Sequence, residues 1–289
     1  MAHLAERRRA FRELHREGCF VLPNPWDVGT ARYLQGLGFK ALATTSAGYA
    51  FSCGLPDNAV PRDTMLRHLR EIVAAVDVPV NADFEGGYAD DPAGVAENVR
   101  RCVETGVAGL SIEDSTGDRR RPLYDLDHAA ARIRAARRAI DQAGGEVVLT
   151  GRAECFLVGV RDMDETIRRL TAYAEAGADC LYAPGIRTRE QIQAVVRAVA
   201  PRPVNLLVGA PVGLTVADAA ALGVRRISVG GALARTAWSG FIRAARQLAT
   251  EGRFEAFAEA TPMPELNGFF REDHARRPEA GPAAPSPSP

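Results

Sequence analysis

Acidic side chains stand at the ends of three consecutive strand-like runs in this sequence. Asp83 and Glu85 close the third run, Glu113 closes the fourth, and Glu154 closes the fifth. Neighbouring parallel strands lie about 4.8 Å apart, so carboxylates at their ends can converge on one hard cation. Any one of these acids could instead cap a helix or pair with an arginine. Because the pattern recurs on three strands, and strand alternation would point Asp83 and Glu85 to one side, we predict a Mg²⁺ or Mn²⁺ site among these strand-end acids.

Polar side chains near these acids could bind an anionic substrate. Arg152 could grip a carboxylate through a bidentate fork, or pair with the strand-end acids. Asn205, which ends the seventh run, could hydrogen-bond the same carboxylate or only satisfy nearby backbone groups. In the small-residue segment 44–57, Ser46 could donate to an anion or belong to a tight turn. Asp57 is a candidate acid or base near the mouth of the site, or a solvated turn aspartate.

The lysine and histidine positions argue against several mechanisms. The sole lysine, Lys40, lies at the predicted start of a strand, which is the wrong end of a barrel for catalysis. Schiff-base chemistry and pyridoxal phosphate catalysis both need a lysine in the site. The histidines occupy predicted helices or terminal segments, which argues against a histidine metal site or a Ser-His-Asp triad. They are His3, His15, His68, His128 and His274.

Composition restricts the partners and the compartment. Lysine plus arginine and aspartate plus glutamate number 36 each, so no net field attracts nucleic acid or an anionic membrane. The cysteines are odd in number and form no C-x-x-C pair, as in a reduced intracellular protein. No apolar run approaches the roughly 20 residues that span a bilayer, and the charged N-terminal helix lacks the apolar core of a signal peptide. We therefore predict a cytoplasmic protein that binds a small carboxylate, without a nucleic-acid or membrane partner.

The scaffold that must position these residues consists of strand-like runs alternating with longer helical stretches. The runs are CFVLP (19–23), KALATTS (40–46), VPVNADF (78–84), AGLSIED (108–114), EVVLTGRAE (146–154), DCLYAP (179–184), RPVNLLV (202–208) and RRISVGG (225–231). Helical stretches such as 62–76, 91–105 and 125–141 carry apolar residues at three- and four-residue spacing. Glycine follows several of them where a helix C-cap is needed, as in ETGVAGL, EAGADCL and ALGVRRI. This alternation predicts an α/β fold, a (β/α)8 TIM-type barrel.

The chain divides by sequence character into three parts. Residues 1–250 provide the barrel with an N-terminal helix. Residues 251–275 form an extra helical segment rich in apolar side chains, including Phe254 and Phe257, which must cover either its own barrel or a neighbouring subunit. Residues 276–289 are rich in Pro, Ala and Ser and cannot build a core, so this tail is predicted to be disordered.

Several segments together resemble the isocitrate lyase and phosphoenolpyruvate mutase superfamily over roughly residues 18–250. They are VLPNPWDVGTARYL, ATTSAGYAFSCGLPD, VNADFEGGY, GLSIEDS, TGRAE and AGADCLYAPG, in the right order at barrel spacing. The resemblance implies a barrel whose last helix is exchanged with a neighbouring subunit, giving homodimers or homotetramers. It also implies Mg²⁺ held near Asp83, Glu85 and Glu113, with a small 2-oxo acid or its enolate on the metal. The substrate carboxylate would then contact Ser46, the Gly48 backbone and Arg152.

The sequence departs from this family pattern in several places. The lyase loop K-[KR]-C-G-H, whose cysteine is the general acid, is replaced by STGDRRRPLYDL (115–126), which argues against isocitrate or methylisocitrate cleavage in the usual manner. Glu85 replaces the usual aspartate and is one methylene longer, so it could shift the metal or add a direct ligand. The seventh strand reads NLLVGAP, without the hydroxyl residues that follow the asparagine in lyases, so a second carboxylate would be held poorly. Arg119, Arg120 and Arg121 could close the loop over an anionic substrate, or form a solvated face.

These observations predict a Mg²⁺-dependent lyase or hydrolase for a small 2-oxo acid or related carboxylate. A C–C or P–C bond would break through a metal-stabilised pyruvate-like enolate, with Asp57, Arg152 and Glu113 as the catalytic residues. The identity of the general acid or base stays open, as does the bond. One alternative is a phosphoenolpyruvate or phosphonopyruvate mutase or hydrolase, since the mutases also lack the loop cysteine. Another is a non-catalytic relative that binds a 2-oxo acid.

Overall fold

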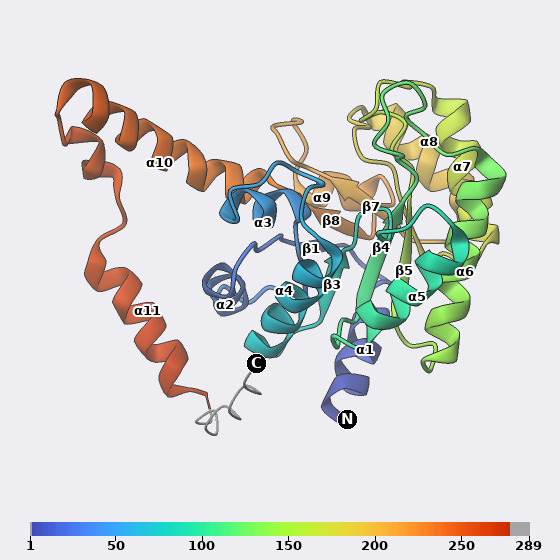
Figure 1. The fold of residues 1–289 in the computed structure, drawn as a ribbon, viewed down its shortest axis with the longest axis horizontal. Coiled ribbons are helices and arrows are strands. Elements are labelled where there is room, and N and C mark those ends of the chain that lie inside the picture. Colours follow the sequence, from blue (N-terminus) through green and yellow to red (C-terminus); the bar gives the residue numbers. More distant parts are fainter. Residues whose placement is uncertain (1, 278–289) are drawn as a thin grey trace. The chain divides into compact units, whose positions relative to one another are not determined.

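The computed structural model describes residues 2–277 and contains one parallel sheet of eight short strands (Figure 1). The strands pair in the order β1-β8-β7-β6-β5-β4-β3-β2. Their bounds are β1 (Phe20–Leu22), β2 (Leu42–Ala43), β3 (Val80–Asp83), β4 (Gly109–Glu113), β5 (Val148–Arg152), β6 (Cys180–Tyr182), β7 (Val204–Leu207) and β8 (Arg226–Ser228). Each predicted run contains one of these strands. The predicted (β/α)8 barrel is therefore confirmed, as a nearly closed barrel.

The seam between β1 and β2 is bridged by single hydrogen bonds and by one buried amide side chain. The Ala43 amide donates to the Pro23 carbonyl at 3.0 Å. Asn24, directly after β1, donates from Nδ2 to the Thr44 carbonyl at 2.9 Å, and its Oδ1 accepts from the Val229 amide at 2.9 Å. Asn24 therefore links the segments that follow β1, β2 and β8, at the end of the barrel where the strands finish.

Helices surround the barrel and follow the strands in sequence. In the first compact unit, which ends at Arg235, they are α1 (Ala2–Leu14), α2 (Val28–Gly36), α3 (Ser46–Ser52), α4 (Arg62–Ala75), α5 (Pro92–Val103), α6 (Leu126–Gln142), α7 (Met163–Glu175), α8 (Arg189–Val199) and α9 (Val216–Ala221). The glycines expected to end three of them, Gly106, Gly177 and Gly223, all have left-handed backbone with φ of 92°, 102° and 91°. Gly177 and Gly223 directly follow the C-cap residues of α7 and α9, and Gly106 lies two residues after that of α5.

Helix α1 packs against the end of the barrel where the strands begin. Phe11 is fully buried in a cluster with Leu22, Ala108 and Val148. Arg8 donates to the Val107 carbonyl at 3.1 Å, immediately before β4. The N-terminal helix thus closes this end with an apolar side chain, while its arginines bind backbone carbonyls that precede the strands.

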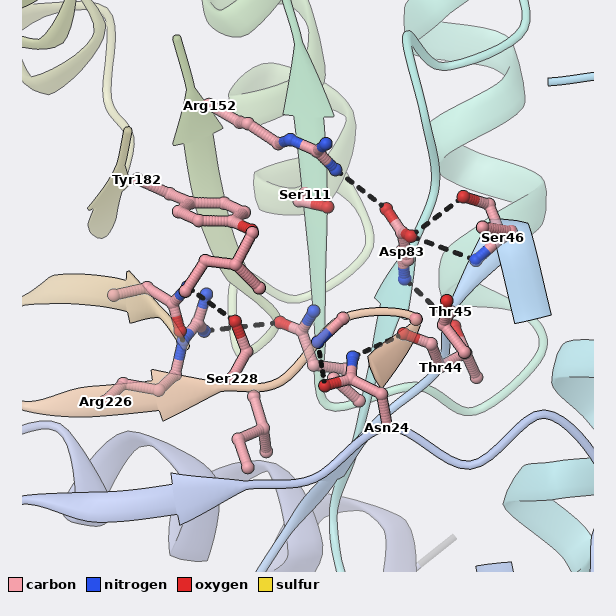
Figure 2. A pocket seen from close by; sticks show the side chains of 18 of the residues that line it. Asn24, Thr44, Thr45, Ser46, Asp83, Ser111, Arg152, Tyr182, Arg226 and Ser228 are labelled. Carbon is pink, nitrogen blue, oxygen red and sulfur yellow. Dashed lines mark hydrogen bonds and ion pairs between the residues drawn. The ribbon is translucent and has the colours of Figure 1, made fainter. Parts of the chain in front are cut away.

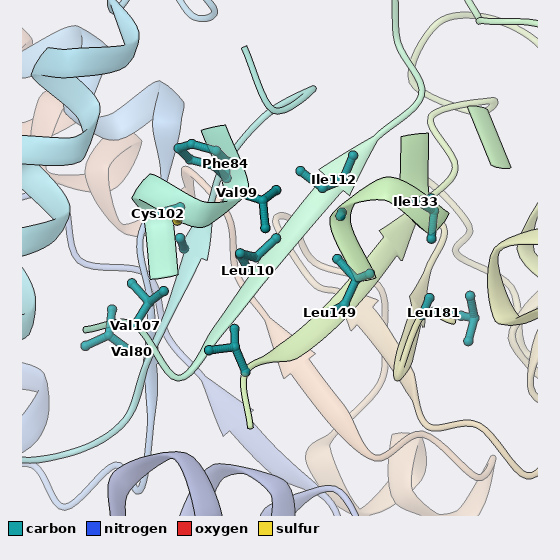
Figure 3. Close-up of a cluster of buried hydrophobic side chains, with 14 of the residues drawn as sticks. Val80, Phe84, Val99, Cys102, Val107, Leu110, Ile112, Ile133, Leu149 and Leu181 are labelled. Atoms are coloured by element: carbon teal, nitrogen blue, oxygen red, sulfur yellow. The ribbon is translucent and has the colours of Figure 1, made fainter. Parts of the chain in front are cut away.

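The apolar core lies between the strands and their helices (Figure 3). In β4, Leu110 and Ile112 are buried, with Val99 of α5 and Ile133 of α6 in the same cluster. Successive side chains of a strand point to opposite faces, so Ser111 between them faces the barrel interior. The helices therefore cover the apolar face of the sheet, and the inner face is left for polar side chains.

The second compact unit begins at Thr236. It holds most of α10 (Ala232–Glu251), a short 3₁₀ helix (Glu255–Glu259) and α11 (Met263–Ala275). The division of the chain at residue 250 stays a prediction, as does disorder of the tail 276–289, which from residue 278 lies outside the described residues. Among the residues described, none of the helices combines the length and the apolar character that crossing a membrane requires.

Candidate active site

A cavity of about 190 Å³ lies at the ends of the barrel strands (Figure 2). The last residue of every strand except β4 lines it. These residues are Leu22, Ala43, Asp83, Arg152, Tyr182, Leu207 and Ser228. This is the end of a parallel barrel where catalytic groups gather, so the cavity is the candidate active site.

Arg152 is the centre of a buried ion-pair cluster at this cavity. Its Nη1 lies 3.2 Å from Asp83 Oδ1 and 3.1 Å from Glu113 Oε2, and its Nε lies 2.5 Å from Glu154 Oε1. Its guanidinium also lies over the Tyr182 ring, 5.2 Å from the centroid. Burial acts to lower the pKa of Arg152, but Glu113 and Glu154 outweigh it and raise that pKa well above its usual value. The pairing with strand-end acids, one of the two interpretations from sequence, is the arrangement present here.

Ser46 and Asp57 lie beside Asp83 in the cavity wall. Asp83 Oδ2 accepts hydrogen bonds from the Ser46 amide at 3.0 Å and from the Ser46 hydroxyl at 2.9 Å (Figure 2). The Asp57 carboxyl oxygen lies 3.4 Å from the same hydroxyl. Burial, followed by the charge of Asp83, raises the pKa of Asp57. Ser46, Asp57 and Asp83 therefore form one polar group at the start of α3.

Gly48 lies one turn into α3 and does not face the cavity lining. Its amide donates to the Thr45 hydroxyl at 3.2 Å, which caps the helix. A Cβ at this position would meet Thr45 Cγ2 at 2.7 Å and Trp26 Cβ at 3.1 Å. Glycine is therefore needed here for close packing.

Glu85 and Glu113 line a second hollow that adjoins the ion-pair cluster. The expectation that strand alternation aligns Glu85 with Asp83 does not hold, because β3 ends at Asp83 and Glu85 has left-handed backbone with φ of 48°. Glu85 is buried, and among the described residues its Oε1 has no hydrogen-bond partner. Burial and then Asp83 raise the pKa of Glu85 to about 7, and burial raises that of Glu113 well above its usual value.

The charges of this cluster are unbalanced. Asp57, Asp83, Glu85, Glu113 and Glu154 bring five carboxyl groups, whereas among residues 2–277 Arg152 is the one cation paired with them. Within residues 2–277, no group of three or more His, Cys, Asp or Glu side chains has the spacing of a formed metal site. The oxygen donors and the unpartnered Glu85 oxygen nevertheless suit a hard divalent cation.

Two buried side chains, those of Asp114 and Arg132, hold the strand ends in place. The sequence did not predict their contacts. Asp114 Oδ1 accepts from the Glu154 amide at 2.8 Å, while its Oδ2 accepts from Tyr173 of α7 at 2.5 Å. Arg132 of α6 donates to the Glu113 carbonyl at 3.0 Å and to the Gly86 carbonyl. Both contacts join a helix to a strand end far away in sequence, so no local pattern indicates them.

Asn205 is buried and belongs to a deeper polar group. Its Oδ1 accepts from Arg226 Nε at 2.8 Å and its Nδ2 donates to the Ser228 hydroxyl at 2.9 Å. Arg226 also lines the cavity, although it was not predicted as a site residue. Arg226 is the first residue of β8, whereas the catalytic groups of a barrel are expected at the last residues of its strands.

The loop 115–126 forms a short turn closed by an antiparallel bridge between Ser115 and Leu123. Arg119, Arg120 and Arg121 are exposed on it, and Arg121 lies 3.7 Å from Asp125. Of the three arginines, Arg119 lines the hollow next to the active-site cavity. The gating role of this loop stays a prediction.

The predicted absence of histidine from the strand ends is confirmed. His3 and His15 lie on or just after α1, His68 lies on α4, His128 on α6 and His274 on α11. His15 nevertheless reaches the barrel from below, where its Nε2 lies 3.4 Å from Arg226 Nη1.

Curated proteins similar to this chain include enzymes that act on small carboxylates. An uncharacterized protein of Mycobacterium tuberculosis (strain ATCC 25618 / H37Rv) is 37% identical over 224 residues, which cover 76% of this chain and 81% of the relative. Oxaloacetate decarboxylase of Paraburkholderia xenovorans (strain LB400) is 31% identical over 231 residues, covering 77% and 74%.

Solved structures agree in fold over nearly the whole chain. A protein of Burkholderia cenocepacia J2315 has a TM-score of 0.90 at 50% identity, covering 93% of this chain and 98% of that one. 2,3-dimethylmalate lyase, a member of the PEP mutase/isocitrate lyase superfamily, has a TM-score of 0.80 at 28% identity, covering 94% and 96%. Phosphonopyruvate hydrolase in complex with oxalate and Mg²⁺ has a TM-score of 0.81 at 25% identity, covering 93% and 96%.

The family model described as phosphoenolpyruvate phosphomutase matches residues 11–249, which include every strand and all the strand-end acids. The homologues and structural neighbours are lyases and mutases of one superfamily, as the sequence motifs predicted. The chain is therefore an enzyme of the phosphoenolpyruvate phosphomutase family, within the isocitrate lyase/PEP mutase superfamily.

Proposed function

We propose that the protein is a Mg²⁺-dependent lyase or hydrolase that cleaves a C–C bond of a small 2-oxo acid through a pyruvate-like enolate. The observation that carries the proposal is the excess of carboxyl groups around Arg152, with the buried Glu85 oxygen left unpartnered. Buried charges are costly unless a counter-charge meets them. A divalent cation would supply that charge, and Asp83, Glu85 and Glu113 would hold it. When bound, Mg²⁺ would polarise the 2-oxo group and stabilise the developing enolate charge.

The side chains around the cavity would orient the substrate. Arg152 presents a planar fork that suits a carboxylate, and substrate binding would exchange one of its present acidic partners for the substrate. The Ser46 hydroxyl lines the cavity and would contact the same carboxylate, whereas the Gly48 amide is already bonded to the Thr45 hydroxyl. Asn205 would act from below by holding Arg226 and Ser228 in position.

Asp57 is our candidate for moving the proton. It lines the cavity, lies 3.4 Å from the Ser46 hydroxyl, and has a raised pKa because of burial and the nearby Asp83 charge. A carboxyl group whose pKa is raised keeps its proton to a higher pH than usual and can release it to a carbanion. This role would replace the cysteine acid that loop 115–126 lacks.

A turnover screen with Mg²⁺ and Mn²⁺ tests the proposal. Oxaloacetate, methylisocitrate, isocitrate, phosphonopyruvate and phosphoenolpyruvate would be supplied, with pyruvate, glyoxylate and phosphate release as the readouts. Asp83→Asn should lower kcat at least roughly 100-fold and weaken Mg²⁺ binding in calorimetry, because it removes a ligand charge. The control Asp63→Asn, at an exposed position of α4, should change neither. Full turnover by a folded Asp83→Asn protein would refute the role of the metal.

Cleavage of a P–C bond is a second candidate function. It is favoured by the absence of a loop cysteine and by the structural similarity to phosphonopyruvate hydrolase, whose structure contains Mg²⁺ and oxalate. Phosphate release from phosphonopyruvate, or formation of phosphonopyruvate from phosphoenolpyruvate seen by phosphorus NMR, would support it over C–C cleavage.

We also propose that the protein is a cytoplasmic homodimer or homotetramer in which the C-terminal helix is exchanged. The cysteines within the described residues are free thiols, which suits a reducing compartment. Large apolar side chains of the second unit, such as Phe241, Phe254 and Phe257, are exposed, which suits an interface between copies.

A further inference from the structure

Arg226 is a buried arginine in the floor of the active-site cavity. It is the first residue of β8, only 2% of its side chain is exposed, and it lines the same cavity as Arg152 and Asp83. In Figure 2 it lies away from Asp83 and Ser46, with Tyr182 drawn between it and Arg152. It therefore belongs to a layer below the ion-pair cluster.

Every hydrogen-bond partner of Arg226 within the described residues is uncharged. Nε donates to Asn205 Oδ1 at 2.8 Å and Nη2 donates to Thr150 Oγ1 at 3.0 Å. Nη1 lies 3.5 Å from Asn81 Oδ1 and 3.4 Å from His15 Nε2. Arg152, by contrast, pairs with three carboxylates. Arg152 is thus paired with negative charges, whereas the hydrogen-bond partners of Arg226 in the described residues are neutral.

The histidine beside Arg226 does not supply a charge of either sign. His15 Nδ1 lies 2.7 Å from the Phe11 carbonyl, so Nδ1 carries the proton and Nε2 accepts from Arg226. Burial and then the Arg226 charge lower the pKa of His15 to about 3. The imidazole is therefore neutral at physiological pH, and no counter-ion for Arg226 lies among the residues that the structure describes.

The layer around Arg226 is also unusually polar. The inside of a (β/α)8 barrel is ordinarily filled with bulky branched apolar side chains. Here Asn81, Ser111, Thr150 and Asn205 line the interior instead, and three of these border the cavity directly. Since a buried charge without a counter-ion costs several kcal/mol, an anion that enters the cavity would be bound strongly.

We infer that Arg226 binds a second carboxylate of the substrate, so that the enzyme is selective for a 2-oxo dicarboxylate over a monocarboxylate. This inference rests on the proposed function, because it takes the first carboxylate to lie at Arg152. Thr150 precedes Arg152 by two residues on β5, and Asn81 precedes Asp83 by two on β3. The layers are therefore separated by about 6.6 Å along the strands, a distance that suits a four-carbon dicarboxylate.

This assignment accounts for the seventh strand. NLLVGAP lacks the hydroxyl residues that would hold a second carboxylate after the asparagine. Asn205 instead fixes the Arg226 guanidinium through Nε, which leaves an Nη2 hydrogen and the full charge for the ligand. Arg226 is thus a specificity-determining residue, and Asn205 is a positioning residue for it.

Calorimetric titration in the presence of Mg²⁺ tests the inference without requiring turnover. The probes are pyruvate, with one carboxylate, and 3,3-difluorooxaloacetate, with two. Arg226→Met should weaken binding of the dicarboxylate about 100-fold and change pyruvate binding less than about threefold. The matched control is Arg225→Met, which removes the same charge from the adjacent residue. The Arg225 side chain donates to the Gly18 carbonyl, so this variant should bind both probes as the wild type does. Melting temperatures would establish that both variants fold.

A second comparison uses only the wild-type protein and applies even where Arg226→Met does not fold. Oxaloacetate would be replaced by its C4 amide, 2-oxosuccinamate, which has nearly the same shape with one charge fewer. The amide should compete with pyruvate at least about tenfold more weakly than difluorooxaloacetate does. The inference would be overturned if Arg226→Met weakened the binding of both probes equally, or if the wild type bound the dicarboxylate and its amide with equal affinity. In either case, pyruvate binding would still support the proposed function. Absence of binding by either probe to the wild type would overturn both.

Discussion

At the scale of single residues, the main feature is the competition of several carboxylates for Arg152. Asp83, Glu113 and Glu154 all lie within ion-pair distance of one guanidinium, in a place with little access to water. Removal of one partner from a buried pair leaves the other charge desolvated and uncompensated. We therefore expect Arg152 to affect the stability of the free protein as well as its turnover.

Arg152→Met should destabilise the protein by about 3 to 5 kcal/mol, measured by urea unfolding. Glu154→Gln should be destabilising by itself but neutral or stabilising when Arg152 is already Met, because it then removes an unpaired charge. The exposed Arg134→Met should change the unfolding free energy by less than about 0.5 kcal/mol. Additive effects of the two cluster variants would show that the pair is not coupled.

At the scale of elements, the packing of α3 on α4 places a neutral histidine beside α3, the helix that begins at Ser46. His68 of α4 is 2% exposed, stacks on Tyr49 of α3 with ring centroids 3.7 Å apart, and has an unpartnered Nε2 among the described residues. Burial lowers the pKa of His68 to about 4. The unfolded chain, with an ordinary pKa near 6.5, therefore binds more protons than the native state between these values.

This difference predicts a pH dependence of stability. The contribution of neutral His68 is complete above pH 6.5 and is lost progressively as the pH falls towards 4, by up to about 2 kcal/mol between pH 7 and pH 5. His68→Phe keeps the stacked ring and removes the titrating group. Urea unfolding at several pH values should show a shallower loss for the variant, and parallel curves would contradict the prediction.

The loop 115–126 offers a second prediction for an element. Its arginines are exposed, and the Arg121–Asp125 pair has 75% and 87% of its side chains accessible, so it contributes little to stability. Alanine at Arg119, Arg120 and Arg121 should sharply reduce turnover while metal binding and melting temperature stay nearly unchanged. A matched triple of exposed helix arginines, Arg67, Arg70 and Arg134, should leave turnover intact when changed to alanine. Unaltered turnover of the loop variant would end the gating hypothesis.

At the scale of the whole molecule, the second unit has few internal partners for its apolar side chains. Phe241 is 61% exposed and packs edge-to-face on Trp238, with centroids 5.3 Å apart. A cluster of large exposed rings is typical of an interface. Phe241→Glu should therefore shift the species seen by light scattering towards the monomer. A wild-type protein that is monomeric at every concentration would contradict the proposed oligomer.

The sequence by itself determined the barrel, the acidic residues at its strand ends and the positions of the histidines away from them. These follow from short-range patterns, since apolar periodicity defines strands and helices, and parallel strands bring their last residues together. Gly106 and Gly177 were recognisable because a helix end requires left-handed backbone, whatever the chain does elsewhere. The family motifs added specificity, and the comparisons confirm the family that they predicted.

Only the tertiary structure decided which charges meet. The sequence left the partner of Arg152 open, and it aligned Glu85 with Asp83 by an alternation that ends two residues before Glu85. It gave no indication that Arg226 would lie in the cavity floor beside Asn205, Thr150 and a neutral imidazole. Such contacts join residues that are far apart in the chain, and their energies depend on burial and local charge, which no spacing in the sequence encodes.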